Sequence, residues 1–276
     1  FDLRSLALLR VSAPLVYLIE LLLNWQYIGA YLTDQGLLTR TTLFQGTAGW
    51  SVYLAVGTIV GAKFLYICHM LALVSLILGF ATPWSSLACY IFTYSLQHRF
   101  PALPGWETEI RMLFLIGCFL PWGEFASLDS YRNKGPISNY LVVSPATIAW
   151  RTQIVILYLF SGLLKSGSGW ADGTAVEGSL ASDAYSNPAG LWFLSHCQHY
   201  PGLLETFSFA VPLVEIFCPL LLLSPWPALQ ILTVIILWTL HAGFGLFLHI
   251  GMFSPICCVC LLAFVPSSIW DSWHKR

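Results

Sequence analysis

The stretch IVILYLFSGLLKSGSGW, residues 154–170, places a lysine where a long apolar run ends. Glycines at positions 167 and 169 follow Lys165 within four residues. An apolar run closed by glycine predicts a membrane-buried helix that ends near Lys165. Two interpretations of this lysine stay open. The ammonium extends to the lipid headgroups, or it is a base at the edge of a dry cavity, since desolvation disfavours its charged form.

The composition of the whole chain agrees with a membrane protein. Of its 276 residues, 57% are hydrophobic and only 9% are charged, whereas about 25% of residues are charged in soluble domains. We therefore predict an all-α, polytopic integral membrane protein in the lipid bilayer. The net charge of −1 gives no indication of a nucleic-acid partner. Because the sequence opens at Phe1 without a methionine, we expect residues to precede it.

Apolar segments long enough to approach the thickness of a bilayer recur along the chain. Eight of them are predicted to span the membrane, near residues 6–30, 51–80, 83–98, 110–124, 148–166, 203–223, 226–248 and 253–269. The third, fourth and eighth are the shortest. Together they predict one transmembrane domain over residues 1–276.

Charged residues predict how the domain is oriented, because cytoplasmic loops are rich in Lys and Arg. With eight spans, the basic residues at the start of the chain, in or beside the fourth loop and at the end of the chain fall on one side: Arg4, Arg10, Arg132, Lys134, Arg151, Lys275 and Arg276. The opposite loops carry the acidic residues Asp34, Glu107, Asp172, Glu177 and Asp183. We therefore expect both termini in the cytoplasm and Lys165 toward the extracytoplasmic face.

The longest connection between predicted spans covers residues 167–202. It is rich in Gly, Ser and Ala but also contains Trp170, Tyr185, Trp192, Phe193 and Tyr200. A free linker has few aromatic residues. We expect this segment to form an ordered cap, with short interfacial helices that pack on the membrane surface.

The stretch WETEIR, residues 106–111, combines two acidic residues with an arginine. Acidic residues in the first turn of a helix are favoured by the helix dipole, and Glu107 would pair with Arg111 one turn later. In the functional interpretation Glu107 instead lies at the same membrane face as Lys165 and belongs to its site.

Two histidines lie in the stretch LHAGFGLFLHIG, residues 240–251. His241 and His249 are eight residues apart, which corresponds to about 80° around one helix. Imidazoles in an apolar helix are not expected to face lipid, so they would bind a metal, shuttle a proton or bond to neighbouring helices. Gly245 between them allows another helix or a flat ligand to approach the backbone.

The remaining ionisable residues in apolar segments are candidates for internal pairs. Lys63 would pair with Glu20 or Glu215. Seven of the eight cysteines lie in apolar stretches, which indicates buried thiols rather than a disulfide framework. We expect no metal site, because CCVC at 257–260 lacks zinc spacing. Walker, HExxH and GxSxG motifs do not occur in the sequence.

Several stretches together resemble one known family. They are FDLRSLALLRVS at the start of the chain, YLTDQGLL at 31–38, SLDSYR at 127–132, YLFSGLLKSGSGWADGTAVEGSL at 158–180 and HIGMFSPICCVCLLAFVP at 249–266. In this order they are similar to the HTTM membrane domain. That domain occurs in vitamin K-dependent γ-glutamyl carboxylase and its bacterial relatives.

The resemblance implies a chemistry for Lys165. In the family a lysine at this position, here at matching distances from Tyr158, Gly162 and Trp170, is the catalytic base. It deprotonates a reduced quinone, whose reaction with O2 yields a base strong enough to remove a γ-proton from glutamate, and CO2 then adds. The resemblance implies that Lys165 is the catalytic base, and we expect Glu107 and His98 to be catalytic beside it. Trp170, His241, Gly245 and His249 would bind the quinone.

The sequence departs from the carboxylase in two respects. It ends after the last apolar segment, where the carboxylase continues into a lumenal region that recognises its protein substrate. It also has Glu107 where the carboxylase uses a histidine, and His98 is the nearest imidazole. The leading hypothesis is a carboxylase-like enzyme that modifies a secreted or membrane peptide. The alternative is a non-catalytic subunit or maturation partner that holds lipid or quinone within a larger membrane complex.

Overall fold

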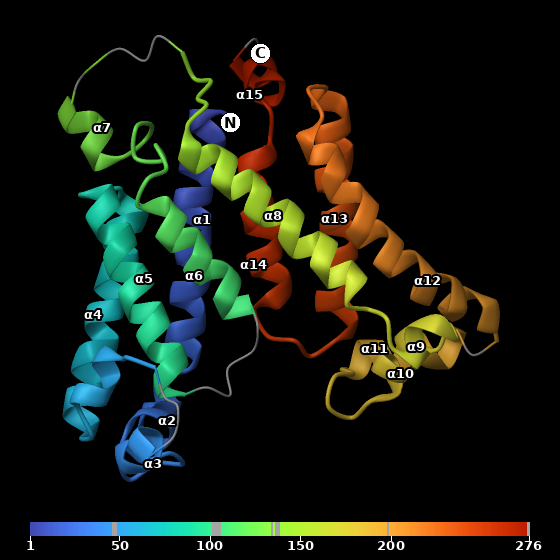
Figure 1. Cartoon of the computed structure of the whole chain (residues 1–276), viewed down its shortest axis with the longest axis horizontal. Helices are drawn as coiled ribbons and strands as arrows, with labels where there is room; N and C mark the ends of the chain where they lie inside the picture. The colour runs from blue at the N-terminus through green and yellow to red at the C-terminus, as the bar shows by residue number, and fades with distance from the viewer. Residues whose placement is uncertain (46–48, 101–105, 134, 136–138, 198, 275–276) are drawn as a thin grey trace. The chain divides into compact units, whose positions relative to one another are not determined.

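The computed structural model describes residues 1–45, 49–100, 106–133, 135, 139–197 and 199–274. These residues form helices and connecting loops, as the predicted all-α class requires (Figure 1). An isolated β-bridge joins Ser186 to Leu248. The predicted basic residues Lys134, Lys275 and Arg276 lie outside the described part of the chain.

The chain divides into two compact units. The N-terminal unit comprises residues 3–146, and the C-terminal unit comprises Phe1–Asp2 with Thr147–Arg276. The prediction of one transmembrane domain over the whole chain stays a prediction, and each unit is described by itself.

Four longer helices build the N-terminal unit. They are α1 (Leu3–Leu23), α4 (Ile59–Leu78), α5 (Thr82–Arg99) and α6 (Trp106–Gly117). In chain order α4 packs on α1, α5 on α4 and α6 on α5 (Figure 1). The connections contain short helices: η1 (Trp25–Tyr27), α2 (Ile28–Leu32), α3 (Arg40–Gln45), η2 (Val52–Ala55) and α7 (Leu128–Asn133).

Arg10 is part of α1 and caps another helix. Its guanidinium donates hydrogen bonds to the carbonyls of Leu76 and Ile77 in the last turn of α4, at 3.1 and 2.9 Å, and to Ala126. Gly79 ends α4 with a φ of +67°, a conformation that glycine adopts without strain. The helix begins at Leu3, so Arg4 and Arg10 lie within it rather than ahead of it.

Asp129 of α7 caps the start of α5, as Arg10 caps the end of α4. Its carboxylate accepts hydrogen bonds from the backbone N–H groups of Ala81 and Thr82 and from the Thr82 hydroxyl, at 2.7–2.9 Å. Burial opposes ionisation of this carboxyl, but the hydrogen bonds from Thr82 and Ala81 outweigh it and lower the pKa of Asp129. The ionised Asp129 carboxylate therefore stabilises the N-terminus of α5, where the helix dipole favours a negative charge.

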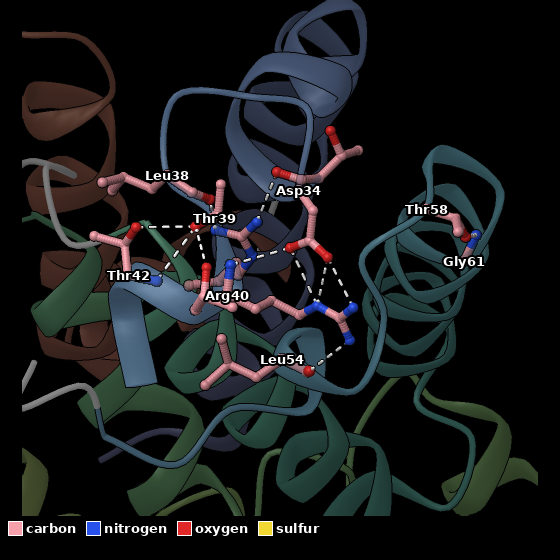
Figure 2. A network of polar contacts seen from close by, with 11 residues as sticks. Asp34, Leu38, Thr39, Arg40, Thr42, Leu54, Thr58 and Gly61 are labelled. Carbon is pink, nitrogen blue, oxygen red and sulfur yellow. Dashed lines mark hydrogen bonds and ion pairs between the residues drawn. The ribbon is translucent and has the colours of Figure 1, made fainter. Parts of the chain in front are cut away.

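The loop after α2 is held by Asp34 and Arg40 (Figure 2). Arg40 donates from Nε and from its backbone N–H to the Asp34 carboxylate, and its Nη2 lies 2.7 Å from Oδ2. The hydrogen bonds from Arg40 lower the pKa of Asp34. Asp34 also donates its N–H to the Gly57 carbonyl at 2.9 Å, so the network joins this loop to the segment before α4.

The C-terminal unit contains most of α8 (Pro145–Leu163), whose first two residues belong to the other unit. The other helices are α9 (Ser168–Ala171), α10 (Ala175–Ala181), α11 (Pro188–Cys197), α12 (Pro201–Phe217), η3 (Cys218–Leu223), α13 (Pro227–Phe247), α14 (Phe253–Cys260), η4 (Leu261–Phe264) and α15 (Ser267–His274). In this unit α14 packs on α13, and α13 packs on η3 (Figure 1).

The segment 167–202 contains the three short helices α9, α10 and α11, which we call the cap helices. Leu180, Leu194 and Cys197 form a small buried cluster with Leu204 of α12. The N–H of Val176 in α10 donates to the Ser208 hydroxyl of α12 at 3.0 Å. The cap helices are therefore packed and hydrogen-bonded to α12. Their position outside the cytoplasm stays a prediction.

Five stretches of described residues are long and apolar enough to cross a membrane: Leu3–Leu23, Ile59–Leu78, Pro145–Leu163, Gly202–Leu223 and Pro227–Phe247. The other three predicted spans coincide with α5, α6 and α14. The helices α6 and α14 have only 12 and 8 residues, and α5 is rich in polar residues. The count of eight spans is therefore not established. The predicted first span also ends early, because the helix stops at Leu23.

The long apolar helices expose large hydrophobic side chains. In α4, Val60 is 76% exposed and Phe64 is 64% exposed, although their helix has a buried face that includes Tyr66 and His69. Exposed apolar surface of this kind is unfavourable in water and favourable in hydrocarbon. The chain accordingly has the character of an integral membrane protein.

Candidate functional site

Lys165 continues the last turn of α8. The N–H of Leu164 bonds to the carbonyl of Phe160 at 2.9 Å, and the N–H of Lys165 bonds to that of Gly162 at 3.1 Å. Tyr158, Ser161 and Lys165 are spaced three and four residues apart, and such residues share one face of a helix. The side chain of Lys165 is 19% exposed.

The ammonium of Lys165 is bound to Glu215 of α12. Its Nζ donates to Glu215 Oε2, to the Ser161 hydroxyl at 3.0 Å and to the Ser161 carbonyl at 3.3 Å. The Ser161 hydroxyl in turn donates to Glu215 Oε2 at 3.1 Å. The Glu215 side chain is only 4% exposed. Lys165 is therefore part of a largely buried ion pair, an arrangement that neither interpretation of the sequence anticipated.

Gly162 allows the two helices to come this close. A Cβ atom at position 162 would lie 2.6 Å from Ile216 Cγ1 and 2.8 Å from the carbonyl oxygen of Pro212. Real Cβ atoms essentially never approach neighbours so closely. The missing side chain of Gly162 lets α12 approach α8 directly, and this places Glu215 beside Ser161 and Lys165.

Trp170 covers the ammonium from the first of the cap helices. Lys165 Nζ lies 5.5 Å from the centroid of the Trp170 ring, within the range of a cation–π interaction. The helix α9 carries Trp170, and Gly167 precedes it with extended backbone. The predicted grouping of Lys165 with Trp170 is present in the structure. Asp172, which follows α9, and Glu177 of α10 are exposed.

A second polar pair lies in the same unit. The Tyr158 hydroxyl and His241 Nε2 are 2.6 Å apart, and the His241 side chain is buried. Among the described residues His241 Nδ1 has no hydrogen-bond partner. The rings of Phe244 and Phe253 meet the imidazole edge to face, with centroids 5.8 and 5.4 Å away. His241 therefore presents one free nitrogen within an aromatic surrounding.

Gly245 and His249 occupy different environments from His241. A Cβ atom at position 245 would lie 3.1 Å from Ser254 Cβ, so the close neighbour of Gly245 is the helix α14. The helix α13 ends at Phe247, and Leu248 already has extended backbone. The expectation that His241 and His249 share one helix is therefore wrong. His249 is exposed, and its backbone N–H bonds to the Tyr185 carbonyl at 2.5 Å.

Glu107 and His98 belong to the N-terminal unit. Glu107 is buried in the first turn of α6. His98 lies in the last turn of α5, where its Nδ1 is 2.9 Å from the Tyr94 carbonyl and its ring stacks on that of Tyr94. Their participation in a site with Lys165 stays a prediction.

The pairing of ionisable residues differs from the one predicted. Lys63 was expected to pair with Glu20 or Glu215, but its Nζ lies 5.6 Å from the centroid of the Trp25 ring. Glu20 accepts a hydrogen bond from the Asn24 amide at 2.8 Å. Arg111 donates to Gln97 Oε1 at 2.6 Å, and its charge also attracts Glu107, the partner predicted for it.

Sequence reasoning did not assign Glu215 to the site of Lys165. The available signal was its position, because a carboxylate well inside an apolar segment needs a partner. The partner could not be chosen from sequence: Lys63 was the expected partner, and Lys165 lies 50 residues away along the chain.

Comparison with known proteins agrees with the resemblance seen in the sequence. No curated protein and no solved structure matches the chain significantly. The HTTM domain matches residues 1–270, which is nearly the entire chain. The family membership suspected from the sequence is therefore confirmed, and this chain belongs to the HTTM domain family.

Proposed function

We propose that the chain is a membrane-embedded, carboxylase-like enzyme that uses a reduced quinone, with Lys165 as its base. The observation that carries this proposal is the contact of Lys165 Nζ with Glu215 Oε2 and Ser161 beneath the Trp170 ring. A lysine becomes a base only when it can lose its proton. Glu215 is a partner to which that proton can pass.

The surroundings of His241 fit a flat ring that carries oxygen atoms. Phe244 and Phe253 supply aromatic surfaces, and His241 Nδ1, which has no hydrogen-bond partner in the described part of the chain, supplies one buried polar atom. Small-molecule sites generally combine apolar walls with a few such polar groups. These residues, with Trp170, would hold the quinone. When bound, the reduced quinone together with O2 supplies the strong base that permits addition of CO2 to a carbon acid.

The residues of the chain have separate tasks in this proposal. Ser161 fixes the Lys165 ammonium through its hydroxyl and its carbonyl. Glu215 takes or returns the proton at Nζ, and low exposure keeps bulk water from competing for it. The hydrogen bond between the Tyr158 hydroxyl and His241 Nε2 fixes the orientation of the imidazole ring, and Nδ1 is left to contact the quinone. The substrate would be a peptide or protein with an acidic carbon.

One observation favours a non-catalytic subunit instead. The three acceptors of the Lys165 ammonium match its three N–H groups, so the charged form is fully hydrogen-bonded. A structural ion pair between α8 and α12 would have this geometry. In that alternative the chain holds lipid or quinone for a partner in a membrane complex.

The deciding experiment is quinol epoxidation by the purified chain in lipid nanodiscs, with reduced naphthoquinone, O2, bicarbonate and a glutamate-rich peptide. We expect epoxide from the wild type, none from Lys165→Ala, and strongly reduced product from Glu215→Gln. The matched control is Lys63→Ala, because Lys63 is also a lysine of a long apolar helix but lies over Trp25. Equal epoxide from wild type and Lys165→Ala would contradict the proposal, and so would absence of epoxide from folded wild type.

A further inference from the structure

The N-terminal unit contains a cavity of about 60 Å³ that the proposed function does not use. It lies where α1 ends and α6 begins, and the short helices η1 and α2 complete it. Two carboxylates line it, Glu20 of α1 and Glu107 of α6, together with the amide of Asn24. The volume is sufficient for a small polar group rather than for a whole lipid.

The environment of Glu107 indicates that the cavity binds a ligand. It is 2% exposed, and among the described residues its Oε2 has no hydrogen-bond partner. Burying an ionised carboxylate without a positive partner is strongly unfavourable. The nearest arginine along α6, Arg111, is directed to Gln97 and lies over the Tyr94 ring. Gln97 and the charge of Arg111 act on the Glu107 carboxyl, but a positive group in the cavity would supply the partner that Oε2 lacks among the described residues.

Aromatic side chains surround the same cavity. Tyr17, Tyr27, Tyr31 and Tyr66 all line it. The ring of Tyr31 stacks on Phe100 at 4.3 Å between centroids, and Tyr27 lies 5.8 Å from Tyr31. The Tyr66 hydroxyl is held by the Leu21 carbonyl at 2.9 Å. These contacts fix several rings at the cavity before any ligand binds.

Carboxylates combined with tyrosine rings favour an organic ammonium group over a metal ion. Metal ions bind to several oxygen, nitrogen or sulfur ligands at once, and the described residues contain no group of three His, Cys, Asp or Glu side chains that could hold one. Organic ammonium groups instead bind between aromatic faces next to a carboxylate. We propose that this cavity binds an alkylammonium group, with Glu107 and Glu20 as its anions and the tyrosine rings as its walls.

The group has two possible sources, a free amine and an amine-bearing lipid headgroup. Tyr27 is 44% exposed, so the cavity has an accessible wall through which either source could enter. This inference does not rest on the proposed function, because all of its residues lie in the N-terminal unit and its test needs no turnover.

The test is isothermal titration of the purified full chain with choline and with ethanolamine, beside the neutral isostere 3,3-dimethylbutanol. We expect binding of an ammonium compound and none of the isostere. Glu107→Gln should weaken binding at least about tenfold, because it removes a buried charge partner. The control is Glu109→Gln, since Glu109 is a buried carboxylate of the same helix that does not line the cavity.

A second variant and a lipid arm complete the experiment. Tyr27→Leu changes a half-exposed ring, so it should fold and weaken ammonium binding several-fold, about 0.5–1 kcal/mol for one cation–π contact. Native mass spectrometry from nanodiscs of phosphatidylethanolamine and of phosphatidylglycerol tests the lipid source. Retention of phosphatidylethanolamine that Glu107→Gln abolishes would assign the headgroup. Equal binding of the isostere, equal binding by Glu107→Gln and wild type, or binding in neither arm would overturn the inference.

Discussion

Lys165 and Glu215 lie 50 residues apart in the chain and meet as an ion pair where α8 approaches α12. The Ser161 hydroxyl bonds to both partners, so the pair is a three-residue network rather than a single contact. Buried pairs of this kind lose much of their Coulomb energy to desolvation. Removing only one partner is far more costly than removing both.

The first prediction concerns the stability of this pair. Lys165→Met should destabilise the fold by about 3–5 kcal/mol, because the Glu215 carboxylate is left buried without a positive partner. The double variant Lys165→Met with Glu215→Leu should recover most of that loss. Chemical unfolding in detergent micelles measures both. A double variant as unstable as the single one would show that the pair is not the source of the cost.

The second prediction concerns the approach of α12 to α8. Gly162→Ala should destabilise the unit by about 1–3 kcal/mol, because the new methyl group would collide with Ile216 and the Pro212 carbonyl. Gly167→Ala is the matched control, since a Cβ atom at position 167 would have no neighbour within 4 Å. Thermal unfolding of the two variants decides the matter, and equal midpoints would refute the steric explanation.

The third prediction concerns the partner of His241. Tyr158→Phe removes the hydroxyl that lies 2.6 Å from His241 Nε2, and this should cost about 1–3 kcal/mol because a buried imidazole nitrogen loses its bond. The nitrogen chemical shifts of labelled histidine should change for His241. The exposed Tyr185→Phe should leave them as in wild type. Unchanged shifts in Tyr158→Phe would mean that this hydrogen bond does not set the tautomer.

The fourth prediction concerns pH and the loop held by Asp34. Because Arg40 lowers the pKa of Asp34, this carboxylate stabilises the loop fully at neutral pH. The stabilisation should be lost as the pH falls below about 4 and the carboxylate takes up a proton. Hydrogen exchange of the Arg40 amide, which donates to Asp34 Oδ1, reports the change. In Asp34→Asn this extra loss of protection should be absent, and equal behaviour of the two proteins would contradict the assignment.

Much of the fold was predictable because each long membrane helix corresponds to a continuous apolar segment of the sequence. The predicted ends near Lys165 and near residue 248 lie within a few residues of the observed ends of α8 and α13. The number of spans was less predictable. The segments of α6 and α14 are apolar, but their helices are too short to cross a bilayer by length. Hydropathy does not show where a helix stops inside an apolar run.

The candidate site was predictable only where its residues are close in sequence. Lys165 and Trp170 belong to one motif and are together in the structure. Glu215 and Tyr158, the partners of Lys165 and His241, are joined to them by the tertiary packing of α8 with α12 and α13. Such pairings depend on which faces of two helices meet, and a single sequence does not contain that information.

Ser208 and Glu215 are seven residues apart on α12, which is close to two helical turns, so they project from the same side of that helix. Ser208 is the residue to which α10 is hydrogen-bonded, and Glu215 is the counterion of Lys165. Pro212 lies between them and interrupts the backbone hydrogen bonding of α12. One side of a single helix therefore carries both the attachment point of α10 and the counterion of Lys165, so the two contacts share one backbone with a proline between them.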